Sequence, residues 1–240
     1  MLVGGSLATK AARMVDASEA LELLGPPPRF VGRGGEKLDA ALEHFRVEVT
    51  GRHALDAGAS TGGFTDCLLQ RGAAAVVAVD VGYGQLHERL RADVRVRNLE
   101  RTNIRAVDGA ALGAPFGLVV ADLSFISLRT VLGTLVGLTE AGGDLVLLVK
   151  PQFEAGREEA AKGRGVVRDP AVWRRVLGEV RAASLSQGAA MMEVMPSPIT
   201  GAEGNVEFLV HCRAGAEPAL AVADGALDDV VAAALAEHGD

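Results

Sequence analysis

Short apolar runs alternate with segments of helical spacing along most of the chain after residue 51. The apolar runs predict strands at residues 52–56, 75–80, 94–99, 117–122, 143–150, 191–195 and 206–212. The spacing predicts helices near residues 63–71, 84–92, 127–139 and 170–187. This alternation indicates an α/β fold with a doubly wound, mostly parallel seven-stranded sheet. About ten residues separate the last two strands, which leaves no room for a crossover helix, so the last strand should be antiparallel.

The two ends of the chain differ from this alternating region. Residues 1–24 contain strand and turn fragments that are too small to enclose a core, and the run Pro26–Pro28 forms a stiff extended spacer. Residues 218–238 are rich in alanine and acidic residues and favour an appended helix. We therefore predict three regions, with bounds 1–28, 29–213 and 214–240.

The formal net charge of the 240 residues is −7, which argues against a nucleic-acid partner only when it is averaged over the whole chain. From Glu217 onward there are six acidic residues and no Lys or Arg, so residues 1–216 carry 24 basic and 25 acidic side chains. Local basic clusters therefore remain available. They are Arg29, Arg33 and Lys37, and then Arg157, Lys162, Arg164 and Arg168 in a loop that fits a phosphate clamp, a cover or a merely solvated segment.

The composition also argues against several classes of protein. Cys67 and Cys212 are too few and too far apart for a disulfide framework or a metal site, so we expect no metal. No apolar run reaches the roughly 18 residues that a membrane span needs, and the N-terminus lacks a signal-peptide pattern. We expect a cytoplasmic protein with no membrane partner.

The most informative turn is DAGASTGGF, residues 56–64, which follows a predicted strand and opens a predicted helix. Its glycines allow tight turning and close approach of a ligand, and the first free helix amides can hold an anion. Asp80 ends the next strand and can accept hydrogen bonds from ribose hydroxyls. The residues predicted to bind an adenosine-bearing cofactor are Asp56, Gly58, Ser60, Thr61, Gly62, Gly63, Phe64, Asp80 and Asp122.

Three other interpretations of this turn stay open. A dinucleotide-binding turn would want glycine where Ser60 stands, close to the pyrophosphate. The string GASTG also fits the nucleophile elbow of hydrolases, although no oxyanion motif is present and His211 lies inside a predicted strand. A turn that binds nothing would leave Asp56 and Asp80 unexplained at strand ends.

Two lysines and two carboxylates are candidates for chemistry near this turn. Lys150 ends the most apolar strand and Asp122 ends another, at the edge where a parallel sheet opens its ligand crevice. Lys37 lies upstream of the turn, and Glu207 has apolar neighbours in the last strand. Such a set suits methyl transfer to a ribose hydroxyl, which requires alignment and removal of a proton. Lys150 would act either as the base or as a donor that steers the oxygen.

Six motifs together resemble those of a known family. They are RGGEKL, DAGASTGGF, AVDVGYGQL, ADLSFISL, LVKPQFEAG and GNVEFL. In order and spacing they are similar to the TlyA family, also called hemolysin A, among the FtsJ-like 2′-O-methyltransferases, over about residues 1–213. The resemblance implies a Rossmann-like methyltransferase fold, S-adenosylmethionine as cofactor and a cytidine ribose of ribosomal RNA as substrate. It also implies a catalytic tetrad at Lys37, Asp122, Lys150 and Glu207.

The N-terminal region departs from the family pattern. Members of the family begin with an S4 RNA-binding domain, and residues 1–28 resemble only its second half. We therefore expect cofactor binding to be retained and affinity for ribosomal RNA and ribosomal subunits to be weakened.

Three further classes of function stay open. Enzymes that methylate a base nitrogen commonly carry prolines and an aromatic residue after the fourth strand, whereas here the run is Asp122-Leu123-Ser124-Phe125. The family name suggests a pore-forming hemolysin, and an RNA-binding protein without catalysis is the third class. The acidic C-terminal helix is unlike the basic helices that bind lipid, which argues against pore formation. The sequence predicts no oligomeric state.

Overall fold

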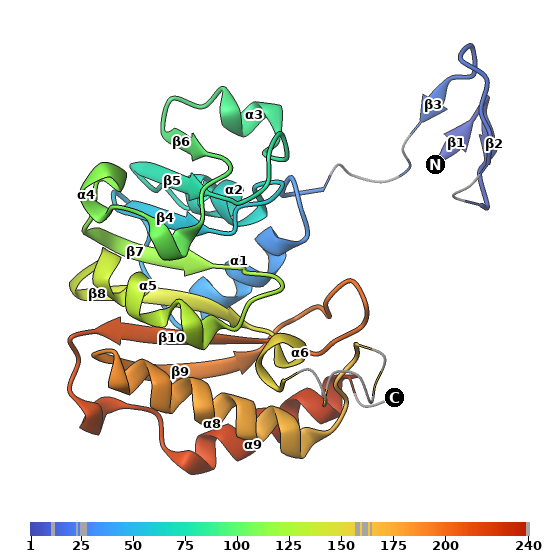
Figure 1. Cartoon of the computed structure of the whole chain (residues 1–240). Coiled ribbons are helices and arrows are strands. Elements are labelled where there is room, and N and C mark those ends of the chain that lie inside the picture. The colour runs from blue at the N-terminus through green and yellow to red at the C-terminus, as the bar shows by residue number, and fades with distance from the viewer. Residues whose placement is uncertain are drawn as a thin grey trace.

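A seven-stranded sheet forms the centre of the protein (Figure 1). The computed structural model describes residues 1–10, 13–22, 24, 28–156, 159, 163 and 165–238. The strands are β4 (His53–Ala57), β5 (Ala75–Val79), β6 (Val96–Leu99), β7 (Phe116–Ala121), β8 (Thr139–Val149), β9 (Ala189–Pro196) and β10 (Phe208–Ala214), in the order β6-β5-β4-β7-β8-β10-β9. The strands from β4 to β8 are parallel, and β10 runs antiparallel between β8 and β9. The predicted doubly wound, mostly parallel sheet with an antiparallel last strand is confirmed.

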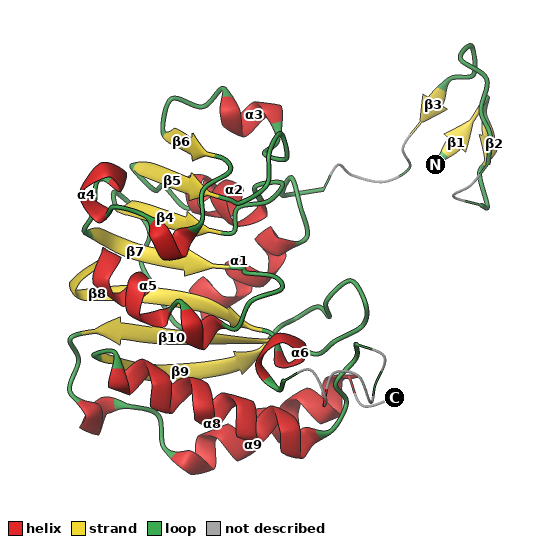
Figure 2. Ribbon diagram, in the orientation of Figure 1, coloured by secondary structure: helices red, strands yellow, loops and turns green. Residues whose placement is uncertain are grey.

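Helices lie around this sheet (Figure 2). They are α1 (Gly34–His44), α2 (Gly63–Gln70), α3 (Glu88–Arg91), α4 (Gly109–Leu112), α5 (Leu132–Leu138), α6 (Pro151–Glu154), α8 (Pro170–Ser186) and α9 (Asp224–His238), with 3-10 turns η1 (Ile104–Ala106), η2 (Leu128–Thr130) and η3 (Pro218–Leu220). The start of α8 follows from its sequence. Asp169 accepts a hydrogen bond from the backbone N of Ala171, and Pro170 occupies the first helical position.

Neighbouring residues of the central strands belong to two different cores, because side chains alternate along a strand. On β7, Val119 and Ala121 join the core under α5, α8 and α9. Leu118 and Val120 join the core under α1 and α2. All four side chains are fully buried. Burial on both faces fixes the register of β7, and so fixes which residue follows it at the carboxyl edge of the sheet.

Several elements differ in extent from the predicted ones. The predicted helix at 84–92 is only α3, because Gly84 has φ +71, a conformation that does not continue a helix. The predicted helix at 127–139 divides into η2 and α5. The short helices α4 and α6 were not predicted, since four residues are too few to show a helical period.

The first residues form a sheet of their own. β1 (Leu2–Val3) lies between β2 (Ser6–Leu7) and β3 (Leu21–Glu22) and pairs antiparallel with both. Two predicted features fall partly outside the described residues: Pro26 and Pro27 of the spacer, and Arg157, Lys162 and Arg164 of the second basic cluster.

Within the described residues, no helix has the length and apolar character needed to cross a membrane. The same ranges contain no group of three or more His, Cys, Asp or Glu side chains arranged to hold a metal ion.

Candidate active site

Two adjoining cavities open at the carboxyl ends of the parallel strands, the edge at which such sheets bind ligands. Their volumes are about 550 Å³ and about 470 Å³. Five residues line both cavities: Gly58, Ser60, Asp122, Ser124 and Phe125. The cavities therefore meet where β4 and β7 end, and two ligands bound there could touch.

The turn between β4 and α2 reaches both cavities. Gly58 has φ +89, and a Cβ there would collide with the backbone carbonyl of Asp122. Gly62, which immediately precedes α2, has φ +99. A Cβ on Gly63 would lie 2.9 Å from the backbone N of Gly35. Glycine is required at these positions because the turn, the start of α1 and the loop after β7 approach one another closely.

Asp80 follows β5 and lies in the smaller cavity. Its Oδ2 accepts a hydrogen bond from the backbone N of Ser60 at 2.7 Å, and its Oδ1 accepts one from Gly82 N at 2.7 Å. A carboxylate has about four acceptor positions, so Asp80 can hold both loops and still accept bonds from a ligand. Residues that sequence reasoning missed line the same cavity after β6: Thr102, Asn103 and Ile104. Their position after a parallel strand was the signal that could have found them.

Asp56 lies within β4 and lines neither cavity. Thr65 Oγ1 donates to its Oδ2 at 2.6 Å, and its Oδ1 is buried without a hydrogen-bond partner among the described residues. Burial raises the pKa of Asp56 to about 7. The other predicted cofactor residues line one or both cavities, with the exception of Gly62: Gly58, Ser60, Thr61, Gly63, Phe64, Asp80 and Asp122.

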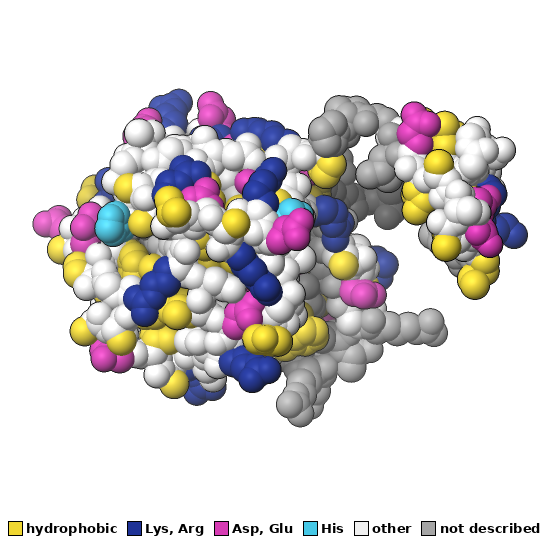
Figure 3. Space-filling model, turned by 90° about the horizontal axis from the view of Figure 1, so that it is seen from above, with side chains coloured by type: hydrophobic (Ala, Val, Ile, Leu, Met, Phe, Trp, Pro, Cys, Tyr) yellow, Lys and Arg dark blue, Asp and Glu magenta, His cyan; other side chains and the backbone are white. Residues whose placement is uncertain are grey.

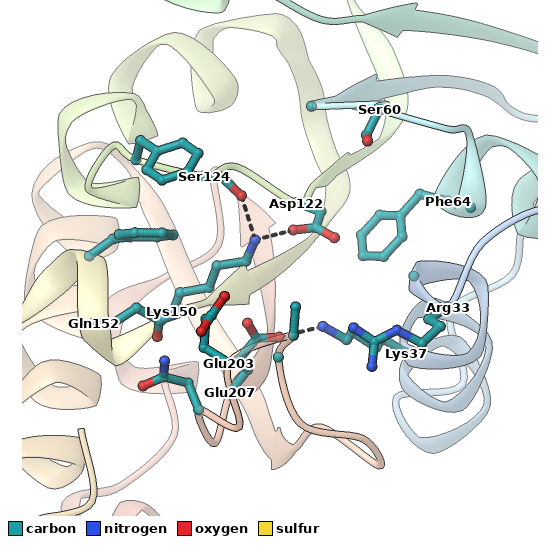
Figure 4. Close-up of a pocket in the computed structure, with 18 of the residues that line it drawn as sticks. Arg33, Lys37, Ser60, Phe64, Asp122, Ser124, Lys150, Gln152, Glu203 and Glu207 are labelled. Carbon is teal, nitrogen blue, oxygen red and sulfur yellow. Dashed lines mark hydrogen bonds and ion pairs between the residues drawn. The ribbon is translucent and has the colours of Figure 1, made fainter. Parts of the chain in front are cut away.

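Lys150 and Asp122 meet at the boundary of the two cavities. Lys150 immediately follows β8, and Asp122 immediately follows the neighbouring strand β7. Lys150 Nζ lies 2.6 Å from Asp122 Oδ1 and donates to Ser124 Oγ at 3.0 Å (Figure 4). An ammonium group has three donors, so one donor of Lys150 is available to a ligand in the larger cavity.

Lys37 and Glu207 form a second ion pair in the larger cavity. Lys37 comes from α1 and Glu207 from the residue before β10. Lys37 is 6% exposed and Glu207 is 3% exposed. The structure thus brings all four predicted catalytic residues, from four separate parts of the chain, to one cavity (Figure 4).

Glu154 of α6 fixes the loop that follows Asp122. Its buried carboxylate accepts hydrogen bonds from Ser127 Oγ at 2.6 Å, from the backbone N of Leu128 and from Arg129 Nε at 3.1 Å. Because α6 immediately follows Lys150, this network holds Lys150 and the loop in one arrangement.

The larger cavity also contains residues to which the sequence analysis assigned no catalytic or cofactor-binding role. Phe125 is 92% exposed and has φ +64, a conformation that is rare for a bulky side chain. Its ring centre lies 5.4 Å from that of Phe153. Three polar residues complete this group: Arg33, Gln152 and Glu203. Exposure of an aromatic ring depends on the local backbone, so the sequence held no signal for it.

Comparison with known proteins assigns the chain to a family. The FtsJ-like methyltransferase family matches residues 30–214. The 16S/23S rRNA (cytidine-2′-O)-methyltransferase TlyA of Mycobacterium tuberculosis is 48% identical over 236 residues, which cover 98% of this chain and 87% of that protein. YqxC of Bacillus subtilis is 48% identical over 204 residues, 84% of this chain and 72% of that protein. A solved structure named as a hemolysin, from Streptococcus thermophilus, has a TM-score of 0.84 and 42% identity, and the match covers 91% of this chain and 79% of that one. The chain therefore belongs to the FtsJ-like methyltransferases, in the TlyA family that is also named hemolysin A.

Proposed function

We propose that this chain transfers a methyl group from S-adenosylmethionine to the ribose 2′-hydroxyl of a cytidine in ribosomal RNA. The observation that carries the proposal is the Lys150–Asp122 pair, 2.6 Å apart, at the boundary of the two cavities. The family match supports methyl transfer, and the name of the M. tuberculosis relative supports a cytidine of ribosomal RNA as the acceptor.

The smaller cavity suits the adenosine part of the cofactor. Asp80 can accept hydrogen bonds from both ribose hydroxyls, while Asn103 and Ile104 offer polar and apolar contacts to an adenine ring. Gly58 lines both cavities and suits the chain that joins adenosine to methionine, and the amides at the start of α2 suit its carboxylate. When it is bound there, the cofactor supplies an activated methyl group at the boundary of the cavities.

Lys150 aligns the acceptor hydroxyl in the larger cavity. Two of its donors already face Asp122 and Ser124, so the third donates to a lone pair of the acceptor oxygen. The other lone pair would then face the methyl group of a bound cofactor. As the carbon–oxygen bond formed, the carbon–sulfur bond of the sulfonium would break to leave a neutral thioether, and the hydroxyl proton would pass to water. Alignment of this kind is a large part of the catalysis that an already activated methyl group requires.

Lys37 and Glu207 form a fixed wall of the acceptor site. Both are buried, and removal of one partner of a buried pair leaves a charge that water cannot reach. A Cβ on Gly201 would lie 2.7 Å from Glu207 Oε1, so the loop beside the pair also packs tightly. We assign to Lys37 the attraction of the ribose and its adjoining phosphate.

Basic side chains on the β6 side of the sheet support an RNA partner. Residues 88–105 contain six arginines against three acidic residues, in a chain whose net charge is −7. The arginines are Arg89, Arg91, Arg95, Arg97, Arg101 and Arg105. Figure 3 looks onto the β6 edge of the sheet and shows Lys and Arg side chains spread over this face. Such a surface attracts the phosphate backbone.

We assign residues 1–28 to an S4-like RNA-binding segment with its linker, residues 29–213 to the catalytic domain and residues 214–240 to an acidic C-terminal helix. Ribosomal RNA as substrate places the activity in the cytoplasm, where ribosomes are assembled and work.

The proposal is tested by incubating the purified chain with ribosomal subunits and S-adenosylmethionine that carries a tritiated methyl group. Label should enter the RNA, and heat-inactivated protein should transfer none. Label that is absent from the RNA, or that enters ribosomal protein, would contradict the proposed acceptor.

A further inference from the structure

A tight turn between β9 and β10 carries an acidic residue into the acceptor cavity. Gly204 N donates to Gly201 O at 3.0 Å, and Gly201 N donates to Asn205 O at 2.9 Å. Glu203 is the third residue of this four-residue turn and lines the same cavity as Lys150 and Glu207 (Figure 4). The turn therefore presents a carboxylate to whatever lies next to the acceptor hydroxyl.

The turn is held rigidly against the catalytic residues. Asn205 is 2% exposed, its Oδ1 accepts a hydrogen bond from Val167 N at 2.9 Å, and its Nδ2 donates to Gly165 O at 2.9 Å. On the other side, the backbone of Gly201 packs against the carboxylate of Glu207. Polar groups that are positioned by such supporting contacts are those that can discriminate between ligands.

The carboxylate of Glu203 has no hydrogen bond or ion pair among the described residues, and its side chain is exposed to the cavity. A negative charge at this place repels the phosphates of an RNA, so it needs a donor on the ligand to offset that cost. Phosphates carry no donor, and in the proposed step the proton of the acceptor hydroxyl passes to water. The donors that differ from one nucleotide to another are on the base.

We propose that Glu203 selects cytidine over uridine by accepting a hydrogen bond from the 4-amino group of the base. This inference rests on the proposed function. Cytosine presents an N–H donor at that position, and Glu is one of the side chains that accepts from it. Uracil presents a carbonyl oxygen there, whose partial negative charge the carboxylate repels. Proteins that recognise RNA sequence form hydrogen bonds with the Watson–Crick edge of unstacked bases, and the 4-amino group belongs to this edge.

The test compares wild-type protein with Glu203→Gln on two RNA substrates that differ only in cytidine or uridine at the modified position. A glutamine amide can donate to the uracil oxygen as well as accept from the cytosine amine. The variant should therefore lower the cytidine-to-uridine ratio of kcat/KM by about tenfold to about a hundredfold, the range for one base-edge contact. Its affinity for S-adenosylmethionine should not change.

Glu193→Gln is the matched control, because Glu193 is an exposed glutamate of β9 that lines neither cavity. Removal of its charge should leave the ratio at the wild-type value. An unchanged ratio in Glu203→Gln, or no transfer to uridine by that variant, would overturn the inference. A wild-type protein that methylates neither RNA on ribose would instead refute the proposed function, so the two failures are distinguishable.

Discussion

The carboxyl end and the middle of β8 carry similar charged groups in different settings. At the carboxyl end, Lys150 contacts Asp122 and Ser124 and faces a cavity of about 550 Å³. In the middle of the strand, Asp144 is 3% exposed and lines neither of the two large cavities. A charged cluster beside a cavity has a donor left for a ligand, whereas an enclosed cluster uses its groups to hold the fold.

The Asp144 cluster is satisfied within the protein. Asp144 Oδ2 accepts a hydrogen bond from Arg52 at 2.6 Å, and Oδ1 accepts from His211 Nε2 at 2.8 Å and from Arg213 at 3.2 Å. Arg52 precedes β4, while His211 and Arg213 belong to β10. Asp144 therefore links three strands of the sheet, and we assign it a structural role.

The largest expected effect is on stability, from Asp144→Asn. The substitution removes the charge that balances Arg52 and Arg213, and loss of one partner of a buried pair costs about 3 kcal/mol. Urea unfolding measures this loss, and the turnover of the molecules that remain folded should match the wild type. A change in unfolding free energy too small to measure, or a folded variant without activity, would show that the middle and the carboxyl end of β8 do not differ in this way.

The next effect is on turnover, from Lys150→Ala. Removal of the donor that aligns the acceptor oxygen should lower kcat by about 100-fold or more. Cofactor affinity and the urea midpoint should stay close to the wild type, because the role proposed for Lys150 is contact with the acceptor, and the residue lines the larger cavity at the carboxyl edge of the sheet. Asp144→Asn is the reciprocal control, with stability lost and turnover kept. Retained turnover in Lys150→Ala would remove Lys150 from the mechanism.

A smaller effect should appear in acid. Burial acts to raise the pKa of Asp144, but hydrogen bonds from His211 and Arg52 outweigh it and hold that pKa well below its usual range. The stabilising contribution is therefore present above the unfolded-state pKa of 3.8 and is lost as the pH falls below it. Wild-type unfolding free energy should fall in this window by up to about 1.4 kcal/mol per pH unit more than that of Asp144→Asn. Parallel curves for the two proteins would contradict the assignment.

The smallest effect is expected from Ser124→Ala. The substitution removes one contact of Lys150 and leaves the 2.6 Å contact with Asp122 in place. A hydrogen bond that involves a charged group is worth about 1.5 kcal/mol or more, so kcat should fall by about tenfold with no change in urea stability. A loss as large as that of Lys150→Ala would mean that Ser124 contacts the substrate itself.

The sequence predicted the fold because buried parallel strands appear as uninterrupted apolar runs that alternate with helical segments. The same reasoning located Lys150 and Asp122, since each immediately follows such a run. The arrangement of Lys37 and Glu207 around the same cavity followed from the family resemblance and not from the spacing.

Other features depend on contacts that spacing does not encode. Asp56 was predicted to bind the cofactor from its place beside the glycines, but alternation along β4 directs it to the face that α2 covers, where Thr65 holds it. Two of the three partners of Asp144, His211 and Arg213, come from β10, which the antiparallel return of the chain brings beside β8. Glu203 and Phe125 face the cavity because of local turn geometry, which no periodicity predicts.

In the proposed function, the carboxyl end of β8 directs a methyl group to a ribose oxygen. Mass spectrometry of nucleosides, from ribosomal RNA that the purified protein has methylated and that is then digested, identifies the methylated atom. We expect 2′-O-methylcytidine. A cytosine or other base that carries the methyl group on a ring or exocyclic nitrogen, with unmodified ribose, would contradict it.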